Sequence, residues 1–197
     1  MTCCCRTKQI LILACGLLAA LAGYAVATGA QKEETFRKEV AGVSLSVTPR
    51  MPEQVAAFYE ARGFSREAVK ALAEACFLTT NVLHRRQDVV WLELDNWRFR
   101  DAEGREIARL PRQYWVALWE QVTLPQGKRA TFGWTQLPES RDLRTGEPVG
   151  GNVVLVPPTG EFSLEARFRT GAFRREGEIV VRLSGLRCPG QRVGRRP

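Results

Sequence analysis

The chain has 197 residues, of which 45% are hydrophobic and 25% are charged, with 17 glycines and 10 prolines. This balance excludes a disordered, low-complexity or collagen-like protein and predicts a chain that folds around one core. The net charge of +8 is dispersed along the sequence, whereas nucleic-acid-binding proteins usually carry a basic stripe and a recognisable module. We therefore expect no nucleic-acid partner.

Residues 1–30 have the features of a membrane segment. No charged residue occurs over residues 9–31, and a helix over residues 10–30 is long enough to cross a hydrocarbon core about 30 Å thick. Arg6 and Lys8 precede it, which predicts a cytoplasmic N-terminus and a translocated domain. We expect one N-terminal transmembrane helix in the inner, cytoplasmic membrane, with the domain in the periplasm or an equivalent extracytoplasmic space.

Cleavage and lipidation are the two alternatives to a transmembrane helix for this segment. Ala25-Val26-Ala27 is a small-x-small sequence at which a secretory signal peptide is cleaved, and Cys15 is a candidate for lipidation. Cys3, Cys4 and Cys5 lie beside the expected membrane entry and are candidates for acylation.

Cys76 and Cys188 are the two cysteines of the expected exported domain. Two thiols in an oxidising compartment predict one disulfide. This bond would close a loop of more than a hundred residues, and the chain-entropy model assigns such a disulfide about 4 to 5 kcal/mol of stabilisation. The alternative is two separate buried thiols, with Cys76 on the apolar face of a helix.

The first part of the domain reads as a strand followed by helices. Residues 31–40 are polar and predict a juxtamembrane stalk. We expect the domain itself to extend over residues 41–188 and residues 189–197 to form a disordered basic tail. Apolar residues alternate over residues 43–48, as in a half-buried strand. Two helices, over residues 52–62 and after the cap residue Ser65 through Phe77, then form a helical hairpin around Gly63.

The rest of the domain reads mainly as strands. A third helix is expected over residues 111–121, and residues 138–151 have no apolar period and predict a long exposed loop. The expected strands cover residues 77–83, 89–95, 97–100, 105–108, 129–136, 152–156, 161–169 and 178–186. The sequence predicts an α+β fold, an antiparallel β-sandwich-like sheet with a packed helical hairpin.

Four residues form the best candidate ligand-binding site. Trp91, Glu93 and Asp95 alternate along the strand expected over residues 89–95, which places them on one face, and Trp97 continues the same alternation at the start of the next expected strand. Carboxylates beside aromatic rings suit carbohydrate, because the carboxylates bond the hydroxyls and the rings stack on the sugar. The alternative is a solvated strand face whose carboxylates pair with arginines.

A metal site is a second, weaker hypothesis. Met51, Cys76 and His84 offer soft ligands that copper prefers, provided that Cys76 is reduced. His84 is the chain's one histidine. The alternative to metal binding is a structural role, as a strand-end residue near the surface that makes local hydrogen bonds. Since the sequence has no GxSxG nucleophile motif and no phosphate-binding glycine loop, we expect neither a cofactor nor a catalytic triad.

All five tryptophans lie between residues 91 and 134. The favoured interpretation is an aromatic core around the third helix, and the alternative is that Trp115 and Trp119 form an exposed interaction patch.

An N-terminal anchor joined to one domain of ordinary size, without a catalytic motif, predicts a non-catalytic, membrane-anchored extracytoplasmic accessory or assembly protein with a protein partner in the envelope. An envelope carbohydrate-binding or hydrolytic module and a copper-handling protein are the alternatives.

Overall fold

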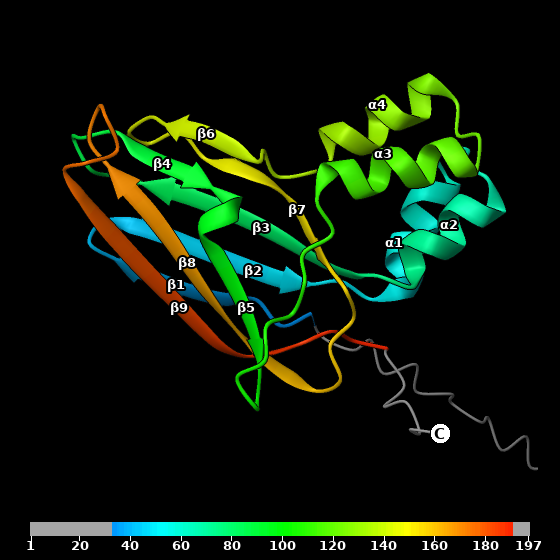
Figure 1. Ribbon diagram of the computed structural model, residues 1–197, viewed down its shortest axis with the longest axis horizontal. Helices are drawn as coiled ribbons and strands as arrows, with labels where there is room; N and C mark the ends of the chain where they lie inside the picture. Colours follow the sequence, from blue (N-terminus) through cyan, green and yellow to red (C-terminus); the bar gives the residue numbers. More distant parts are fainter. Residues whose placement is uncertain (1–32, 191–197) are drawn as a thin grey trace, which may run out of the picture. The chain divides into compact units, whose positions relative to one another are not determined.

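The computed structural model of the chain describes residues 33–190, which form an α+β fold with antiparallel sheets and four helices (Figure 1). The expected transmembrane segment and the tail beyond Gly190 lie outside these residues. Within the described part of the chain, no helix is long and apolar enough to cross a membrane.

The first sheet has the strand order β1-β2-β3-β7, and all its neighbours are antiparallel. Its strands are β1 (Phe36–Val40), β2 (Val43–Pro49), β3 (Cys76–His84) and β7 (Val149–Leu155). Ala41 and Gly42 both have positive φ, which is the geometry of a two-residue hairpin turn and explains the tight β1–β2 connection. Strand β1 takes up residues that the sequence analysis assigned to the stalk.

The second sheet is built around β8 (Glu161–Thr170). This strand pairs with three others, β4 (Val90–Glu93), β5 (Trp97–Asp101) and β9 (Gly177–Arg187), while β6 (Ser140–Leu143) extends the sheet beyond β4. The even-numbered residues of β8 from Phe162 to Thr170 are buried and their neighbours are not, as the alternation predicted.

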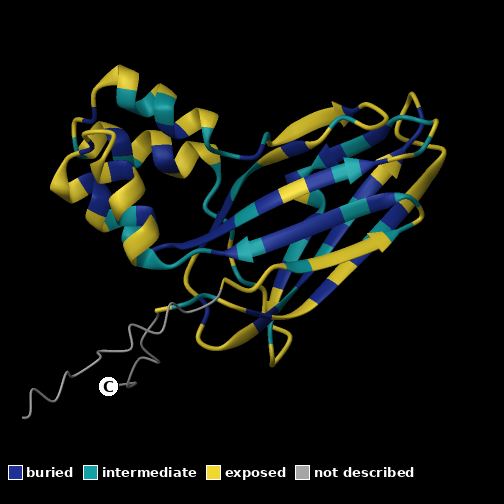
Figure 2. Ribbon diagram, turned by 180° about the vertical axis from the view of Figure 1, so that it is seen from behind, coloured by how far each residue is buried: buried dark blue, intermediate teal, exposed yellow. Residues whose placement is uncertain are grey.

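The buried faces of both sheets contribute to one hydrophobic cluster. Figure 2 shows the alternation of buried and exposed residues along these strands. Members from the first sheet include Leu45, Val47, Leu78 and Val153, and members from the second include Leu92, Phe99, Leu164, Phe168 and Val181.

The four helices lie together at one end of the strands (Figure 1). They are α1 (Pro52–Glu60), α2 (Arg66–Ala73), α3 (Arg112–Gln121) and α4 (Gln126–Trp134). A second cluster joins them to each other and to the sheet residues Phe77 and Val154. The predicted hairpin of α1 and α2 and the predicted helix α3 are confirmed.

Helix α4 corrects the strand expected over residues 129–136. Gly127, Thr131 and Gly133 have low helix propensity, so the local sequence does not favour a helix. Phe132 is the one buried residue of α4 and packs in the helical cluster. This tertiary packing stabilises the helix in spite of its low propensity.

Three further expectations differ from the structure. The loop expected over residues 138–151 contains β6 and the start of β7. Three of the four residues of β6 are exposed, so its sequence shows no apolar alternation that would predict a strand. The strand expected over residues 105–108 is reduced to a single bridge between Arg100 and Glu106. Helix α2 ends at Ala73, so Cys76 begins strand β3 instead of lying on a helix face.

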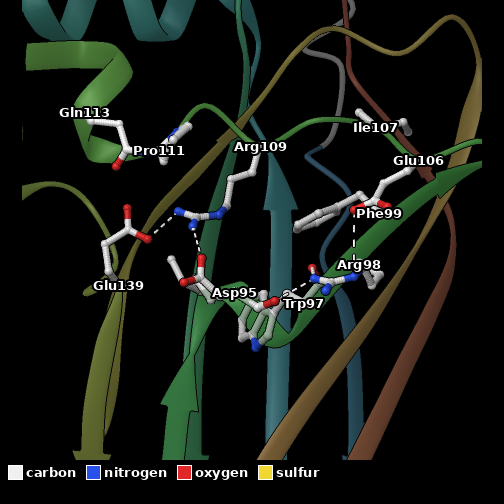
Figure 3. Close-up of a pocket in the computed structure, with 11 residues that line it drawn as sticks. Asp95, Trp97, Arg98, Phe99, Glu106, Ile107, Arg109, Pro111, Gln113 and Glu139 are labelled. Atoms are coloured by element: carbon white, nitrogen blue, oxygen red, sulfur yellow. Dashed lines mark hydrogen bonds and ion pairs between the residues drawn. The ribbon is translucent and has the colours of Figure 1, made fainter. Parts of the chain in front are cut away.

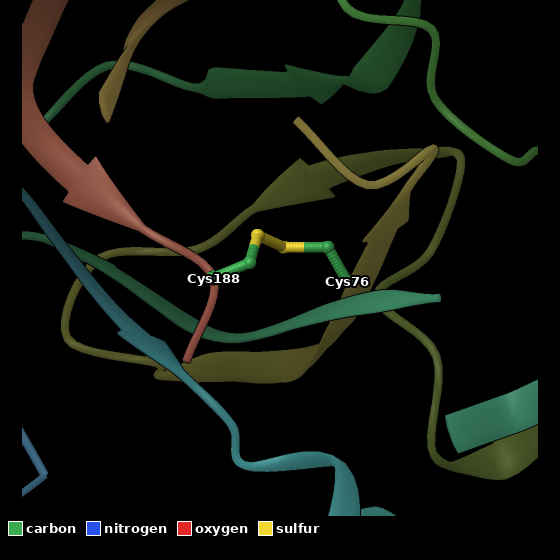
Figure 4. Close-up of a disulfide and its surroundings, with 2 residues drawn as sticks. All are labelled: Cys76 and Cys188. Atoms are coloured by element: carbon green, nitrogen blue, oxygen red, sulfur yellow. A yellow bond between two sulfur atoms is a disulfide. The ribbon is translucent and has the colours of Figure 1, made fainter. Parts of the chain in front are cut away.

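Cys76 and Cys188 form the predicted disulfide, with 5.7 Å between their Cα atoms (Figure 4). Cys76 is the first residue of β3 in one sheet, and Cys188 follows the last residue of β9 in the other. The bond therefore joins the two sheets at the start of β3, shortly after the chain leaves α2.

Replacing both cysteines by alanine should lower the melting temperature while leaving the fold similar. The bond closes a sequence separation of 112 residues. Chain entropy assigns such a bond about 4 to 5 kcal/mol, and each kcal/mol corresponds to several degrees at this size. Calorimetry of the double variant tests the shift. Maleimide labelling of both thiols in denatured, unreduced wild-type protein would contradict the disulfide.

Candidate functional site

Trp91 and Glu93 brace the turn between β8 and β9. The Trp91 indole N–H donates to the carbonyl of Gly171 at 2.8 Å, and the Arg174 guanidinium lies 4.0 Å from the centre of the ring. Glu93 forms an ion pair with Arg174 at 3.2 Å. These two predicted ligand-binding residues are therefore engaged in holding the turn.

Asp95 and Trp97 do not share that face, which corrects the predicted arrangement. Leu94–Asn96 forms a short 3₁₀ turn between β4 and β5, so the strand alternation is broken between Glu93 and Trp97. Asp95 is exposed, whereas Trp97 is only 4% exposed and packs against Phe168 in a T-shaped arrangement. The Trp97 ring offers no free face for stacking on a sugar.

The three predicted copper ligands do not come together. Cys76 and His84 are the two ends of β3, about 26 Å apart at 3.3 Å per residue, and the Cys76 sulfur is in the disulfide. His84 is fully buried, with Nε2 2.9 Å from the Leu143 carbonyl oxygen, which corrects the expected position near the surface. Among residues 33–190, no group of three His, Cys, Asp or Glu side chains could hold a metal ion.

Asp95 instead borders a polar pocket of about 400 Å³ (Figure 3). Arg109 reaches into it and is held between two carboxylates, 3.0 Å from Asp95 and 2.5 Å from Glu139. On another wall, Arg98 lies 3.8 Å from Glu106. Each carboxylate of the pocket thus lies beside a guanidinium, and Arg109 is shared between Asp95 and Glu139.

Glu139 also determines how α3 begins. Its Oε1 atom accepts a hydrogen bond from the backbone N–H of Arg112, the first residue of that helix, at 3.1 Å. A carboxylate at a helix N-terminus satisfies a free N–H group and interacts favourably with the helix dipole. Glu139 therefore replaces the capping side chain that Pro111 cannot provide.

A larger cavity of about 610 Å³ lies between α3, α4 and β7. Trp115 and Trp119 line it and stack with 5.3 Å between their ring centres, and Phe132 packs against both. Trp115, Trp119 and Phe132 all belong to the helical cluster, which confirms the interpretation of Trp115 and Trp119 as core. The exposed side chains of Val116 and Trp134 also border the cavity, and Trp134 is 85% exposed.

The edge of β7 supports both helices of the cavity. Before α3, Leu110 donates its backbone N–H to Val154 at 2.8 Å. After α4, Leu137 donates to Asn152 at 3.0 Å, and a Cβ atom on Gly151 would lie only 2.3 Å from the Leu137 nitrogen. The close approach of the two segments therefore requires glycine at position 151.

The charges around the cavity are unequal. Three arginines and one carboxylate, Glu139, line it, and Arg109 already pairs with that carboxylate. Arg129 donates from Nε to the carbonyl of Leu124 at 2.7 Å and from Nη2 to that of Trp119 at 3.3 Å. The Arg112 side chain is exposed and has no ion pair or hydrogen bond within the described residues, so its charge is available to a ligand.

The polar pocket and the cavity are adjacent, since Leu94, Arg109 and Glu139 line both. Together they offer a cavity bordered by exposed apolar side chains, three carboxylates that pair with two arginines, and an Arg112 side chain that is unpaired within the described residues, an arrangement that suits binding. One feature of the sequence pointed to this region, the concentration of tryptophan over residues 91–134. Arg109, Arg112 and Glu139 were missed because their positions depend on contacts between distant segments.

Tyr59 links α1 to the segment beside the cavity. The Thr135 hydroxyl donates to the Phe132 carbonyl at 2.7 Å, so in the 2.7 Å bond between Tyr59 and Thr135 the tyrosine is the donor. Gln136, which lines the cavity, also donates to the Thr135 oxygen. Burial raises the pKa of Tyr59 to about 12, because the charged phenolate is poorly solvated there.

Comparison with known proteins identifies no family. The chain matches no family model and no curated protein. Two solved structures from Bacillus subtilis are similar: the yjhA protein, at 10% identity and a TM-score of 0.38, over 66% of this chain and 76% of that one, and a "putative lipoprotein (ycdA)", at 9% identity and a TM-score of 0.42, over 76% of this chain and 38% of that one. Likenesses at this level carry no inference about function.

Stability should fall between about pH 10 and pH 12 because of Tyr59. The unfolded phenol ionises near its usual pKa of 10 and the folded one near 12. The contribution is therefore complete below pH 10 and is lost as the pH rises through that window, up to about 3 kcal/mol. Urea unfolding at pH 8 and pH 11.5 measures the loss.

Tyr59→Phe should lack this dependence and lose about 1 kcal/mol at pH 8 with the hydrogen bond. Tyr114→Phe, at an exposed tyrosine, is the matched control and should follow the wild type. An equal alkaline loss in the wild type and in Tyr59→Phe would show that Tyr59 is not responsible.

Proposed function

We propose that the protein is a membrane-anchored extracytoplasmic accessory protein, which acts by binding an envelope partner and not by catalysis. In this proposal the N-terminal segment spans the inner membrane, and the domain, an antiparallel sandwich with the helices at one end, lies in the periplasm or an equivalent space. The cluster shared by both sheets supports the sandwich arrangement.

The Cys76–Cys188 disulfide supports the compartment. Structural disulfides persist in oxidising, extracytoplasmic spaces and are rare in the cytosol. The uncharged N-terminal run and the preceding Arg6 and Lys8 support the same orientation from the sequence.

The cavity between α3 and α4 carries the proposal of binding. Exposed large apolar side chains that gather around a cavity mark interaction sites, and tryptophan and arginine are frequent in them. Val116 and Trp134 border this cavity together with Arg112. We propose that the face formed by α3 and α4 around it contacts a protein partner of the envelope.

Binding of envelope carbohydrate is the second candidate, now at the polar pocket of Figure 3. Asp95, Gln113 and Glu139 line that pocket and could bond sugar hydroxyls. The buried Trp97 ring removes the stacking platform that the sequence suggested, so this candidate ranks below the first.

A photo-crosslinking amino acid at Trp134 should capture one recurrent protein in native membranes. The same amino acid at Phe173 is the control, because Phe173 is 80% exposed and lies in the turn between β8 and β9, away from the cavity lining. Equal capture at both positions would contradict a specific face. Retention on envelope polysaccharide without any recurrent protein would favour the carbohydrate candidate.

A reporter that is active only outside the cytoplasm, fused after Pro197, should be active. Carbonate washing should leave the fusion in the membrane, because a spanning apolar helix resists extraction. Activity of a cytoplasmic reporter at the same position would overturn the proposed location. Release by the wash would indicate cleavage after Ala27 while leaving export intact.

A further inference from the structure

We propose that the free edge of β9 pairs with β9 of a second copy of this chain, so that two copies form a dimer with one continuous sheet. The two strands run antiparallel about a two-fold axis at Val180. This interface is separate from the α3–α4 face that the proposed function assigns to an envelope partner, so each inference can be tested independently of the other.

Strand β9 is the one long sheet edge that the described residues leave uncovered. It borders the second sheet, where residues 177–183 pair regularly with β8 and make no backbone hydrogen bond on their other side within residues 33–190 (Figure 1). Residues 105–107 cover the edge of β5, residues 110 and 137 cover that of β7, and β6 has only four residues. An uncovered edge strand presents N–H and C=O groups that can pair with another chain.

Strand β1, the edge of the first sheet, has a feature against pairing that β9 lacks. It packs against β9 without pairing with it. Lys38 lies opposite the buried Leu45, so a charged residue occupies the side of β1 that faces the core. Inward-pointing charge on an edge strand disfavours addition of another strand. The same side of β9 carries Ile179, Val181 and Leu183, all buried, so a second β9 could continue its apolar side.

Charge determines the register of the proposed pair. Residues directly opposite in an antiparallel pair lie on one face, so the apolar sides of both copies match only when the two-fold axis is at a residue position. An axis at Val180 places Glu178 opposite Arg182 of the second copy, and the reverse. An axis at Glu178 or Arg182 would place like charges opposite each other. An axis at Ile179 or Val181 would place Val180 opposite a charged residue.

The exposed face of β8 and β9 extends the same pattern of charge. Within one copy, Glu165 lies opposite Arg182 and pairs with it at 2.7 Å, and Arg169 lies opposite Glu178. Across the interface the row of residues is therefore Glu165, Arg182, Glu178 and Arg169, with the sign changing at every strand. The side chains of Glu178 and Arg182 are 43% and 64% exposed, so both can reach a second copy. Opposite charges directly across a sheet stabilise it, and like charges destabilise it.

A bulge limits the pairing segment. The register of β8 and β9 shifts between the pairs made by Phe162 and Leu164, and Gly185 has a φ of +74°. A bulge bends its strand, so the flat part of β9 ends near Leu183. Because two-fold pairing occupies this edge in both copies, the assembly is a closed dimer and not a filament.

Charge reversal at the interface tests the proposal. Full-length chains carry a donor or an acceptor fluorophore on a C-terminal tag, and energy transfer is titrated in detergent micelles. We expect Glu178→Lys and Arg182→Glu each to raise the dissociation constant of the dimer about tenfold, because each places like charges opposite each other twice.

Mixing the two variants should restore the wild-type dissociation constant. The lysine of one variant then lies opposite the glutamate of the other, and the second pair is the native one. Mixing would not repair a variant whose own fold had been damaged. Glu147→Lys and Arg141→Glu are the matched controls, since they break an ion pair within one copy away from β9, and they should change nothing alone or mixed.

Disulfide crosslinking locates the axis. Val180→Cys, in a chain whose four N-terminal cysteines are replaced by serine, should form a linked dimer on mild oxidation, because the axis places the two side chains opposite each other. Val116→Cys in the same background is the control, at an exposed position of α3, and should stay monomeric.

Four results would overturn the inference: no energy transfer in the wild type, unchanged dissociation constants in both single variants, no recovery on mixing, or crosslinking through Val116→Cys but not through Val180→Cys. None of them bears on capture of an envelope protein at Trp134, which tests the proposed function separately.

Discussion

The outer edge of β7 is the constraint on which the candidate site depends. One edge of this strand pairs with β3 in the sheet, and the other accepts and donates backbone hydrogen bonds with the segments that enter α3 and leave α4. Both ends of the helix pair are thereby fixed to one strand, and the cavity forms in the space between them. Gly151 permits this arrangement, because any side chain there would collide with the backbone at Leu137. The same contacts protect the edge of β7 from pairing with another chain.

The predictions that succeeded depended on short-range patterns. The strict alternation in β8 and the helical spacing of Val69 and Leu72 in α2 each place a whole face in the core, so periodicity alone defines them. The disulfide was predicted from the expected oxidising compartment and from the presence of only two cysteines in the expected exported domain. These patterns gave the fold class and the two ends of the Cys76–Cys188 bond, but not the way in which the sheets and helices meet.

The predictions that failed concern segments whose structure is imposed by neighbours. Strand β1 buries little beyond Phe36 and Val40 at its ends, and three charged residues between them resemble a linker. Helix α4 has two glycines and one buried side chain, and only packing against Trp115 and Trp119 shows why it is helical. The Arg109–Glu139 pair joins residues 30 positions apart, a contact for which the sequence contains no periodic signal.

The distribution of stability within the domain is consistent with binding at the helices. The sheets share one large hydrophobic cluster, and the disulfide joins them at Cys76, where β3 begins shortly after α2. Helix α4 is held by Phe132, by the bonds of Arg129 and by its two backbone connections. Segments with few buried contacts open at lower free energy than the core. Helix α4 is therefore expected to open at lower free energy than the sheets, and it carries Trp134, the most exposed apolar side chain of the proposed contact face.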